Sequence, residues 1–139
     1  MAARPRARGW ALATATALVV VGLDQLTKGL VRADLVVGEH RDLVAFVDLV
    51  RVDNDGVAFG ALLAFFVVHA GRPLAWLPTG MLVGGAVGNV VDRVRAGAVT
   101  DFLKVPHWPA FNLADTAITL GVVMLIVVLE RDGGAPRGA

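Results

Sequence analysis

Four apolar stretches separated by polar segments dominate the chain, at residues 10–31, 57–70, 74–91 and 111–129. The first and the last have 22 and 19 residues, about the length that an α-helix needs to cross the hydrocarbon core of a bilayer. The two middle stretches have 14 and 18 residues, so a pair of crossings there is short, its first member markedly so. The pattern predicts a helical membrane protein with an unusual middle region.

Basic residues between these stretches predict their orientation. Arginines precede the first stretch, lie in the break at 71–73 and follow the last stretch; they are Arg4, Arg6, Arg8, Arg72, Arg131 and Arg137. Because cytoplasmic segments are enriched in basic residues, we expect these three segments inside the cell. Both chain ends on one side require an even number of crossings. This favours a four-helix transmembrane bundle with a shortened, tilted or partly embedded second helix over a single middle crossing.

Residues 35–56 depart from the helical pattern. The run "LVAFVDLVRVD" is rich in β-branched residues, ends in apolar–polar alternation and is flanked by turn-forming sequences. We expect a small β-cradle outside the membrane. The expected organisation is an all-α membrane protein apart from this cradle, with one domain over 1–139, a cytoplasmic N-terminus at 1–9 and a cytoplasmic tail at 130–139. The basic start could belong to a signal peptide, but no small-x-small cleavage site closes the apolar run, so we expect a retained helix.

Composition narrows the classes of function. Hydrophobic residues make up 56% of the chain and the mean hydropathy is +0.67, which is above the soluble range. The net charge of +1 gives no basic field for nucleic acid. Cysteine is absent, which excludes disulfides, thiolate metal ligands and a cysteine nucleophile. The three histidines stand far apart in the sequence, so we expect neither a metal site nor a cofactor.

Charged residues at the edges of the apolar stretches are the candidates for chemistry. Asp24 and Lys28 are four residues apart and share a helix face, although polar side chains at a helix end that reach the headgroups give the same pattern. Asp115 falls in the first turn of the last helix, where the helix dipole favours a carboxylate, and Asp101 falls in the loop predicted before it. Two carboxyl groups that share a proton can hydrolyse a peptide bond without a metal or a covalent intermediate. On spacing alone, two aspartates at the edges of spans are more often a helix cap and a solvated loop charge.

Five short motifs occur in order along the chain. They are "DQLTK" at 24–28, "NDGVAFG" at 54–60, "GGAVGNVVDR" at 84–93, "GAVTDF" at 97–102 and "FNLAD" at 111–115. Together they resemble the lipoprotein signal peptidases (signal peptidase II), the membrane aspartyl proteases of bacteria, over roughly residues 10–130. The resemblance implies a hydrolase that removes the signal peptide from diacylglyceryl-modified prolipoproteins, cleaving before the lipidated cysteine. It also implies a multi-pass protein of the bacterial cell membrane with its active site on the extracytoplasmic side.

By motif position, the resemblance makes Asp101 and Asp115 the catalytic pair. The residues that it assigns to substrate binding or to support of the site are Asn54, Asn89, Asp92, Arg93, Asn112, Asp24 and Lys28. Turn formation, helix capping and inter-helix hydrogen bonding are the structural alternatives for these. Expected partners are prolipoprotein substrates and membrane lipids, whose chains would lie against the last helix and Phe59, Phe65 and Phe66. We expect a monomer.

The chain departs from the family pattern between Asn54 and Asn89, where about one membrane span of residues is missing. Val57 also stands where the family usually has alanine, and Asp53 where a basic residue is common. Two alternatives therefore stay open beside an active peptidase. One is a truncated, inactive member that binds lipopeptide. The other is a small transporter or proton relay that uses Asp24, Asp92, Asp101 and Asp115.

Overall fold

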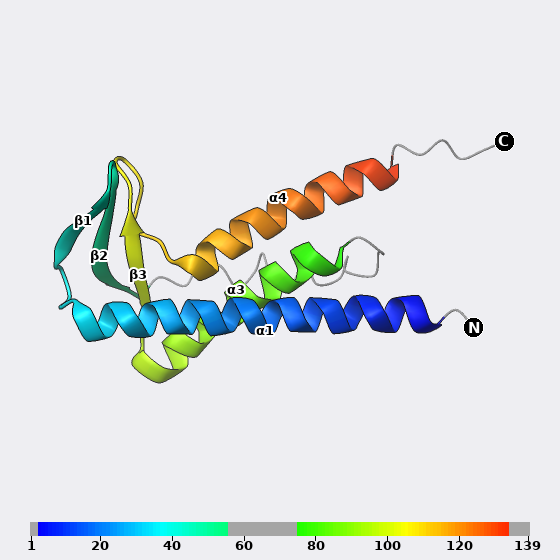
Figure 1. The fold of residues 1–139 in the computed structure, drawn as a ribbon, viewed down its shortest axis with the longest axis horizontal. Coiled ribbons are helices and arrows are strands. Elements are labelled where there is room, and N and C mark those ends of the chain that lie inside the picture. Colours follow the sequence, from blue (N-terminus) through cyan, green and yellow to red (C-terminus); the bar gives the residue numbers. More distant parts are fainter. Residues whose placement is uncertain (1–2, 56–74, 134–139) are drawn as a thin grey trace.

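The computed structural model describes residues 3–55 and 75–133. Its elements are helix α1 (Ala3–Asp34), strands β1 (His40–Val44) and β2 (Val47–Asn54), helix α3 (Trp76–Ala96), strand β3 (Val99–Lys104) and helix α4 (Leu113–Gly133). The three helices run alongside one another, and the sheet stands across the end where α1 finishes and α4 begins (Figure 1). The start of α1 and the end of α4 lie at the opposite end. The fold is thus mostly helical with one small antiparallel sheet, as predicted.

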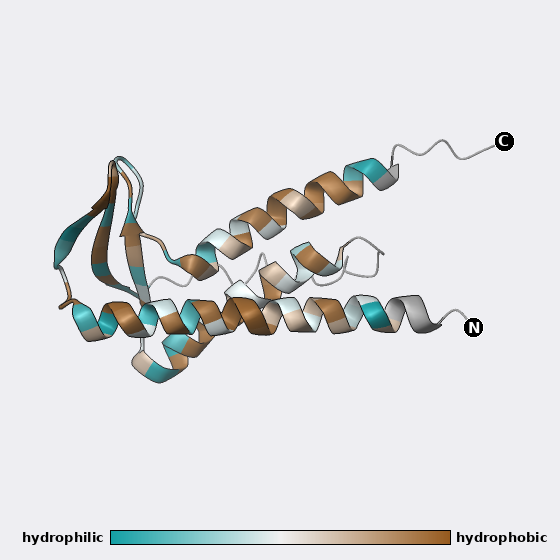
Figure 2. Ribbon diagram, viewed as in Figure 1, coloured by the Kyte–Doolittle hydropathy of each residue, from teal (hydrophilic) through white to brown (hydrophobic). Residues whose placement is uncertain are grey.

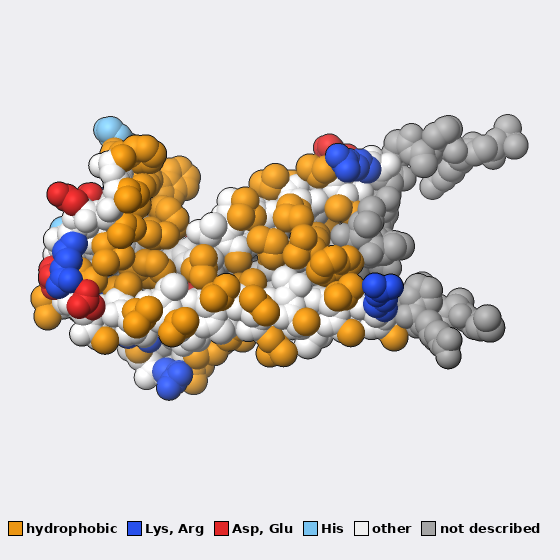
Figure 3. Space-filling view, viewed as in Figure 1, with side chains coloured by type: hydrophobic (Ala, Val, Ile, Leu, Met, Phe, Trp, Pro, Cys, Tyr) orange, Lys and Arg blue, Asp and Glu red, His pale blue; other side chains and the backbone are white. Residues whose placement is uncertain are grey.

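Two helices in the described residues are long and apolar enough to cross a membrane, and both belong to predicted spans. They cover Ala7–Asp34 and Leu113–Arg131. Apolar residues dominate both helices (Figure 2), and many of their large apolar side chains are exposed, as expected of a lipid-facing surface. On the face shown in Figure 3, most charged side chains gather at the two ends of the molecule, with an apolar band between them.

Part of the predicted topology lies outside the described residues. The shortened helix at 57–70, Arg72, and Phe59, Phe65 and Phe66 fall within 56–74, and the end of the tail falls within 134–139. The count of four helices therefore stays a prediction. The third apolar stretch corresponds to α3, with Pro78 in its first turn, where proline is tolerated.

Small residues bring α3 close to both neighbouring helices. A Cβ atom added at Gly84 would lie 2.7 Å from the Cβ of Val20 and 2.8 Å from the carbonyl oxygen of Ala17, both on α1. A Cβ added at Gly85 would lie 2.5 Å from the carbonyl oxygen of Ala114 on α4. Glycine at these two positions therefore allows α3 to approach both helices closely.

The sheet contains a strand that the sequence pattern missed. Its order is β1-β2-β3, and both pairs are antiparallel. Asp101, which was predicted to lie in a loop, is on β3 and pairs with Val52 of β2. The loop prediction was wrong because β3 forms against a partner strand some 50 residues earlier, a long-range pairing that the local pattern does not reveal.

An apolar cluster attaches this sheet to the helix ends. Val31 of α1 and Leu35, the residue after α1, pack with Phe102 of β3, and Leu49, Leu103 and Leu113 surround them. The backbone of Phe111, just before α4, exchanges hydrogen bonds with that of Leu103 at 2.8 and 2.9 Å. The cluster therefore fixes β3 relative to both α1 and the start of α4.

We expect Gly84→Ala to lower the free energy of unfolding by about 1–3 kcal/mol, because the new methyl group meets backbone atoms of Ala17 that cannot move cheaply. The matched control is Gly22→Ala on α1, where an added Cβ has nothing within 4 Å. Since alanine is the better helix former, Gly22→Ala should cause no loss. Thermal unfolding in detergent measures both variants, and equal effects would contradict the close packing.

Candidate active site

One face of α1 carries charged side chains into the protein. Asp24 and Lys28 are fully buried and form an ion pair at 2.8 Å between Lys28 Nζ and Asp24 Oδ2. The other oxygen of Asp24 accepts a hydrogen bond from the backbone N–H of Ala114, at 3.0 Å, in the first turn of α4. The predicted α1 pair is thus an internal contact to α4 and does not reach the headgroups.

Lys28 also links α1 to α3. Its ammonium group donates to Asn89 Oδ1 at 2.9 Å and lies 3.1 Å from Asp92 Oδ2. Arg32, one turn further along α1, lies 2.8 Å from Asp92 Oδ1. These four residues, Asp24, Lys28, Arg32 and Asp92, form an ion cluster with two positive and two negative charges, in which Arg32 alone is partly exposed. Its charges are paired, which buried charges require.

Asn112 lies between the two candidate catalytic acids. As the residue before α4, it accepts a hydrogen bond from the N–H of Asp115 at 2.9 Å, while Asp115 accepts from the N–H of Asn112 at 3.3 Å. This reciprocal arrangement caps the helix in the manner of a capping box. The side-chain amide of Asn112 also donates to Asp101 Oδ1 at 2.8 Å. One fully buried asparagine therefore contacts both carboxyl groups.

The other oxygens of the acids have their own donors. Asn54 at the end of β2 donates to Asp101 Oδ2 at 3.1 Å, and Asn89 of α3 donates to Asp115 Oδ1 at 2.9 Å. Only 3% of Asp101 is exposed, whereas Asp115 is half-buried. Burial, aided by the nearby charge of Asp115, raises the pKa of Asp101, although the amides of Asn54 and Asn112 oppose the shift.

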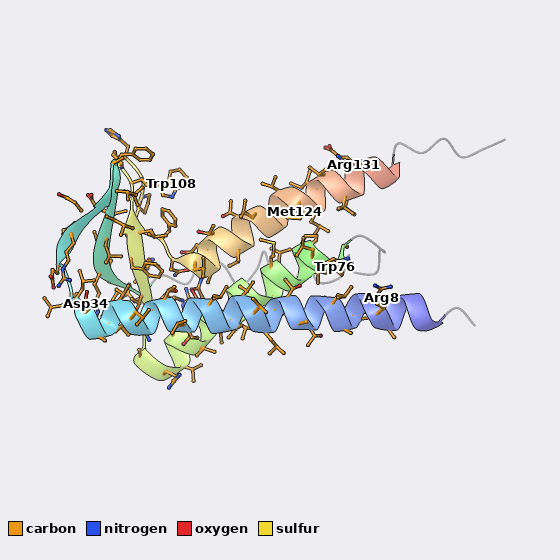
Figure 4. The ribbon with its side chains drawn as sticks, viewed as in Figure 1. Arg8, Asp34, Trp76, Trp108, Met124 and Arg131 are labelled. Atoms are coloured by element: carbon orange, nitrogen blue, oxygen red, sulfur yellow. The ribbon has the colours of Figure 1, made fainter. Side chains whose placement is uncertain are left out.

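Both acids line a cavity of about 520 Å³ beside the start of α4. Asn54, Asn89 and Arg93 provide further polar groups, and the apolar part of the wall comes from β3, from the loop before α4 and from α4 itself. These apolar lining residues are Val99, Trp108, Pro109, Ala110, Phe111 and Leu120. Trp108 lies near the sheet, while Arg8 on α1 and Arg131 on α4 both lie towards the far end of the helices (Figure 4). The cavity can therefore present polar groups and an apolar surface to the same ligand.

All nine predicted site residues lie in the described part of the chain. Five surround the acidic pair or belong to it: Asn54, Asn89, Asp101, Asn112 and Asp115. Asp24, Lys28 and Asp92 form most of the adjacent ion cluster, and Arg93 lines the cavity. Their roles in catalysis or binding stay predictions. In 3–55 and 75–133, no group of three or more His, Asp or Glu side chains is arranged to hold a metal ion.

Sequence reasoning missed three residues of this site. Gln25 donates to Asp92 Oδ1 at 3.0 Å, Arg32 joins the ion cluster, and the backbone N–H of Thr100 donates to Asp92 Oδ2 at 3.1 Å. The spacing of Asp24, Lys28 and Arg32, each four residues from the next, is a signal that could have identified the arginine. The role of Thr100 could be recognised only once strand β3 was known.

These features define a helical membrane protein with a buried acidic site at one end of its helices. The family model described as Signal peptidase (SPase) II matches residues 16–130. The lipoprotein signal peptidase of Syntrophotalea carbinolica is 42% identical, over 84% of this chain and 89% of the relative. That of Cupriavidus necator is 41% identical, over 81% of this chain and 79% of the relative. The chain belongs to the signal peptidase II family.

Solved structures agree with this assignment. A bacterial membrane enzyme determined by the in meso method at 2.3 Å resolution has a TM-score of 0.77 and 27% identity, covering 91% of this chain and 92% of that one. A second such enzyme, at 1.9 Å resolution, has a TM-score of 0.71 and 26% identity, covering 84% and 91%. The fold of the family is therefore present over most of the chain.

The alignment with the S. carbinolica protein has 144 positions but covers 84% of the 139 residues here, or about 117. About 27 positions therefore hold residues of the relative alone. That number is somewhat more than the roughly 20 residues that one membrane-spanning helix requires. The missing span between Asn54 and Asn89 stays a prediction.

We expect Lys28→Met to lower the free energy of unfolding by about 3–5 kcal/mol, because it leaves Asp24 and Asp92 buried without their shared cation. The control is Arg41→Met on β1, an exposed residue paired with exposed Asp34, which should change stability little. Thermal unfolding in detergent measures both. A Lys28→Met protein as stable as the unchanged chain would contradict the role given to the ion cluster.

Proposed function

We propose that this protein is an aspartic endopeptidase that removes the signal peptide from diacylglyceryl-modified prolipoproteins, cutting before the lipidated cysteine. Family membership supports the removal of lipoprotein signal peptides and hence a protease. The observation that carries the aspartic mechanism is the shared position of Asp101 and Asp115, which line one cavity and are both bonded to Asn112.

The surroundings of the two acids give them different roles. Asp115 lies in the first turn of α4 and accepts hydrogen bonds from the side-chain amide of Asn89 and from the backbone N–H of Asn112, and we assign it the role of the base. Asp101 is more deeply buried, and its raised pKa favours the protonated form. A carboxylate and a carboxylic acid facing one cavity are the base and the acid that peptide hydrolysis requires.

Hydrolysis proceeds in two steps. In the first, Asp115 removes a proton from a water molecule, the water oxygen bonds to the scissile carbonyl carbon, and Asp101 donates its proton to the carbonyl oxygen. In the second, the tetrahedral intermediate returns that hydroxyl proton to Asp101, while Asp115 gives its acquired proton to the leaving nitrogen as the C–N bond breaks. The products are the signal peptide with a new carboxyl end and the lipidated cysteine with a free amine, and the pair regains its starting protonation.

The cavity wall fits a substrate that is part peptide and part lipid. Arg93, on the cavity side of α3, is suited to contact substrate carbonyl groups. The apolar residues near the start of α4 offer a surface for acyl chains, each buried methylene contributing about 0.8 kcal/mol. A lipidated substrate in the outer leaflet presents its scissile bond at the membrane surface, so we propose that the site is extracytoplasmic. We also propose a multi-pass topology with four helices, a single domain and a monomer.

Two other functions can be distinguished from the peptidase. Four acids used as a proton relay would lie at several depths, but Asp24, Asp92, Asp101 and Asp115 are connected through Lys28, Asn89 and Asn112 at the sheet end of the helices. An inactive, lipopeptide-binding member is the second candidate, and the roughly 27 alignment positions without residues of this chain favour it. It predicts binding of lipopeptide without cleavage.

Asp101→Asn and Asp115→Asn should each abolish cleavage of a purified, diacylglyceryl-modified lipopeptide, by at least about a thousandfold, because each removes the acid or the base. Asp42→Asn, an exposed acid on β1, should leave the rate unchanged. Detergent-solubilised protein and chromatography of the cleaved peptide provide the measurement. Undiminished cleavage by the variant carrying both Asp101→Asn and Asp115→Asn would overturn the aspartic mechanism.

The pH dependence of cleavage follows from the raised pKa of Asp101. Because the proton of Asp101 is required, the rate should fall as pH rises through that raised pKa, above the range of an ordinary aspartate. The amide of Asn54 stabilises the ionised form, so Asn54→Ala should raise the pKa of Asp101 and move the alkaline limb to higher pH. Asp42→Asn should leave that limb in place. A shift to lower pH in Asn54→Ala would show that Asp101 does not act as the acid.

A further inference from the structure

Neither Arg32 nor Thr100 is among the residues that the resemblance assigns to the site, yet the structure joins them directly. Arg32 Nε donates to Thr100 Oγ1 at 2.8 Å, and another nitrogen of the same guanidinium lies 2.8 Å from Asp92 Oδ1. The backbone N–H of Thr100 donates to the second oxygen of Asp92, at 3.1 Å. The three residues therefore form a closed triangle between α1, α3 and β3.

This triangle acts on the residue before Asp101. Successive side chains of a strand point to opposite faces, so Thr100 faces α1 and α3 while Asp101 faces the cavity. A bond that holds Thr100 from behind therefore also fixes the backbone from which Asp101 projects. The planar guanidinium donates a hydrogen bond to a hydroxyl through Nε and forms an ion pair with a carboxylate through Nη2, a pair of contacts that a lysine cannot reproduce.

The same face of α1 supports the other acid by a separate route. Asp24 accepts the N–H of Ala114, the residue before Asp115, and Lys28 holds Asn89, whose amide donates to Asp115. Residues spaced by four along α1 thus reach both acids from behind. Asp24 and Lys28 hold the surroundings of Asp115 in place, and Arg32 does the same for Asp101.

We propose that Arg32 and Thr100 are positioning residues for Asp101, acting through the β3 backbone without contacting substrate. The proposal rests on the peptidase function proposed above. Half-buried Arg32 is held by buried Asp92, so the ion cluster fixes the position of Arg32. Through its bond to Thr100, Arg32 in turn fixes β3. Small displacements of a catalytic group are costly, because the reacting atoms must approach in a narrow geometry.

The test compares Arg32→Gln, which removes the charged fork, with Thr100→Val, which removes only the hydroxyl and keeps the shape. Each should lower kcat for lipopeptide cleavage about tenfold and leave KM within about twofold, because substrate contacts are intact. Arg32→Lys should recover little of the loss. Arg41→Gln, a change of an exposed arginine on β1, is the matched control and should leave kcat unchanged.

The double variant Arg32→Gln/Thr100→Val distinguishes a joint action from two separate ones. Residues that act through one contact give non-additive effects, so the double variant should also lose about tenfold. A loss of about a hundredfold would show independent action and overturn the proposal. So would single variants with unchanged kcat, or losses confined to KM.

Hydrogen exchange provides a readout that does not depend on activity. Arg32→Gln should speed exchange of the Thr100 amide, because Thr100 loses its side-chain bond to Arg32 and β3 is held less firmly there, while Arg41→Gln should not. If the unchanged protein binds lipopeptide without cutting it, the peptidase function fails, and this exchange measurement alone decides the positioning role. Unaltered exchange at Thr100 in Arg32→Gln overturns that role whatever the activity.

Discussion

The shared ammonium group of Lys28 is the interaction on which the rest of the structure depends. It lies within 3.1 Å of carboxylate oxygens from both α1 and α3, and it also donates to Asn89. A fully buried ammonium is tolerated only when its partners surround it, since the desolvation of a charge costs several kcal/mol. The dependence is mutual, because the buried carboxylates also need the ammonium group. The cation holds Asp24 and Asp92 in place, and these in turn fix the start of α4, the α3–β3 connection and Arg32.

Close helix packing is what allows these short polar contacts. A Cβ atom added at Gly88 would lie only 2.5 Å from Asp24 Oδ2, so the carboxylate occupies space that glycine alone leaves open. Gly80 and Gly84 bring the same two helices together further along, where a Cβ would lie 2.6 and 2.7 Å from side-chain atoms of α1. The glycine-rich face of α3 thus serves both the packing of apolar helices and the placement of the charged site.

The sequence was sufficient for what is local or carried by motifs. Apolar runs predicted the membrane helices, and Asp115 fell in the first turn of α4, as expected from its position in the run. Strand β3 could not be predicted in the same way, because its partner β2 lies far back in the chain and its polar Thr100 and Asp101 suggested a loop. Arg32 could not be predicted as part of the site for a related reason. Its partners, Asp92 and Thr100, come from two elements that only the tertiary fold brings to α1.

The shortening of the chain bears on the substrate more than on the chemistry. The partners of Asp101 and Asp115 come from β2, α3, and the residues at the start of α4, and the groups behind them come from α1. Helices α1 and α4 keep enough length to cross a bilayer. The absence of residues that longer family members have should therefore weaken the binding of lipid more than it disturbs the paired acids. An impaired enzyme of this design would show a raised KM for lipidated substrate with its pH profile intact, whereas a damaged acidic pair would lower kcat and alter that profile.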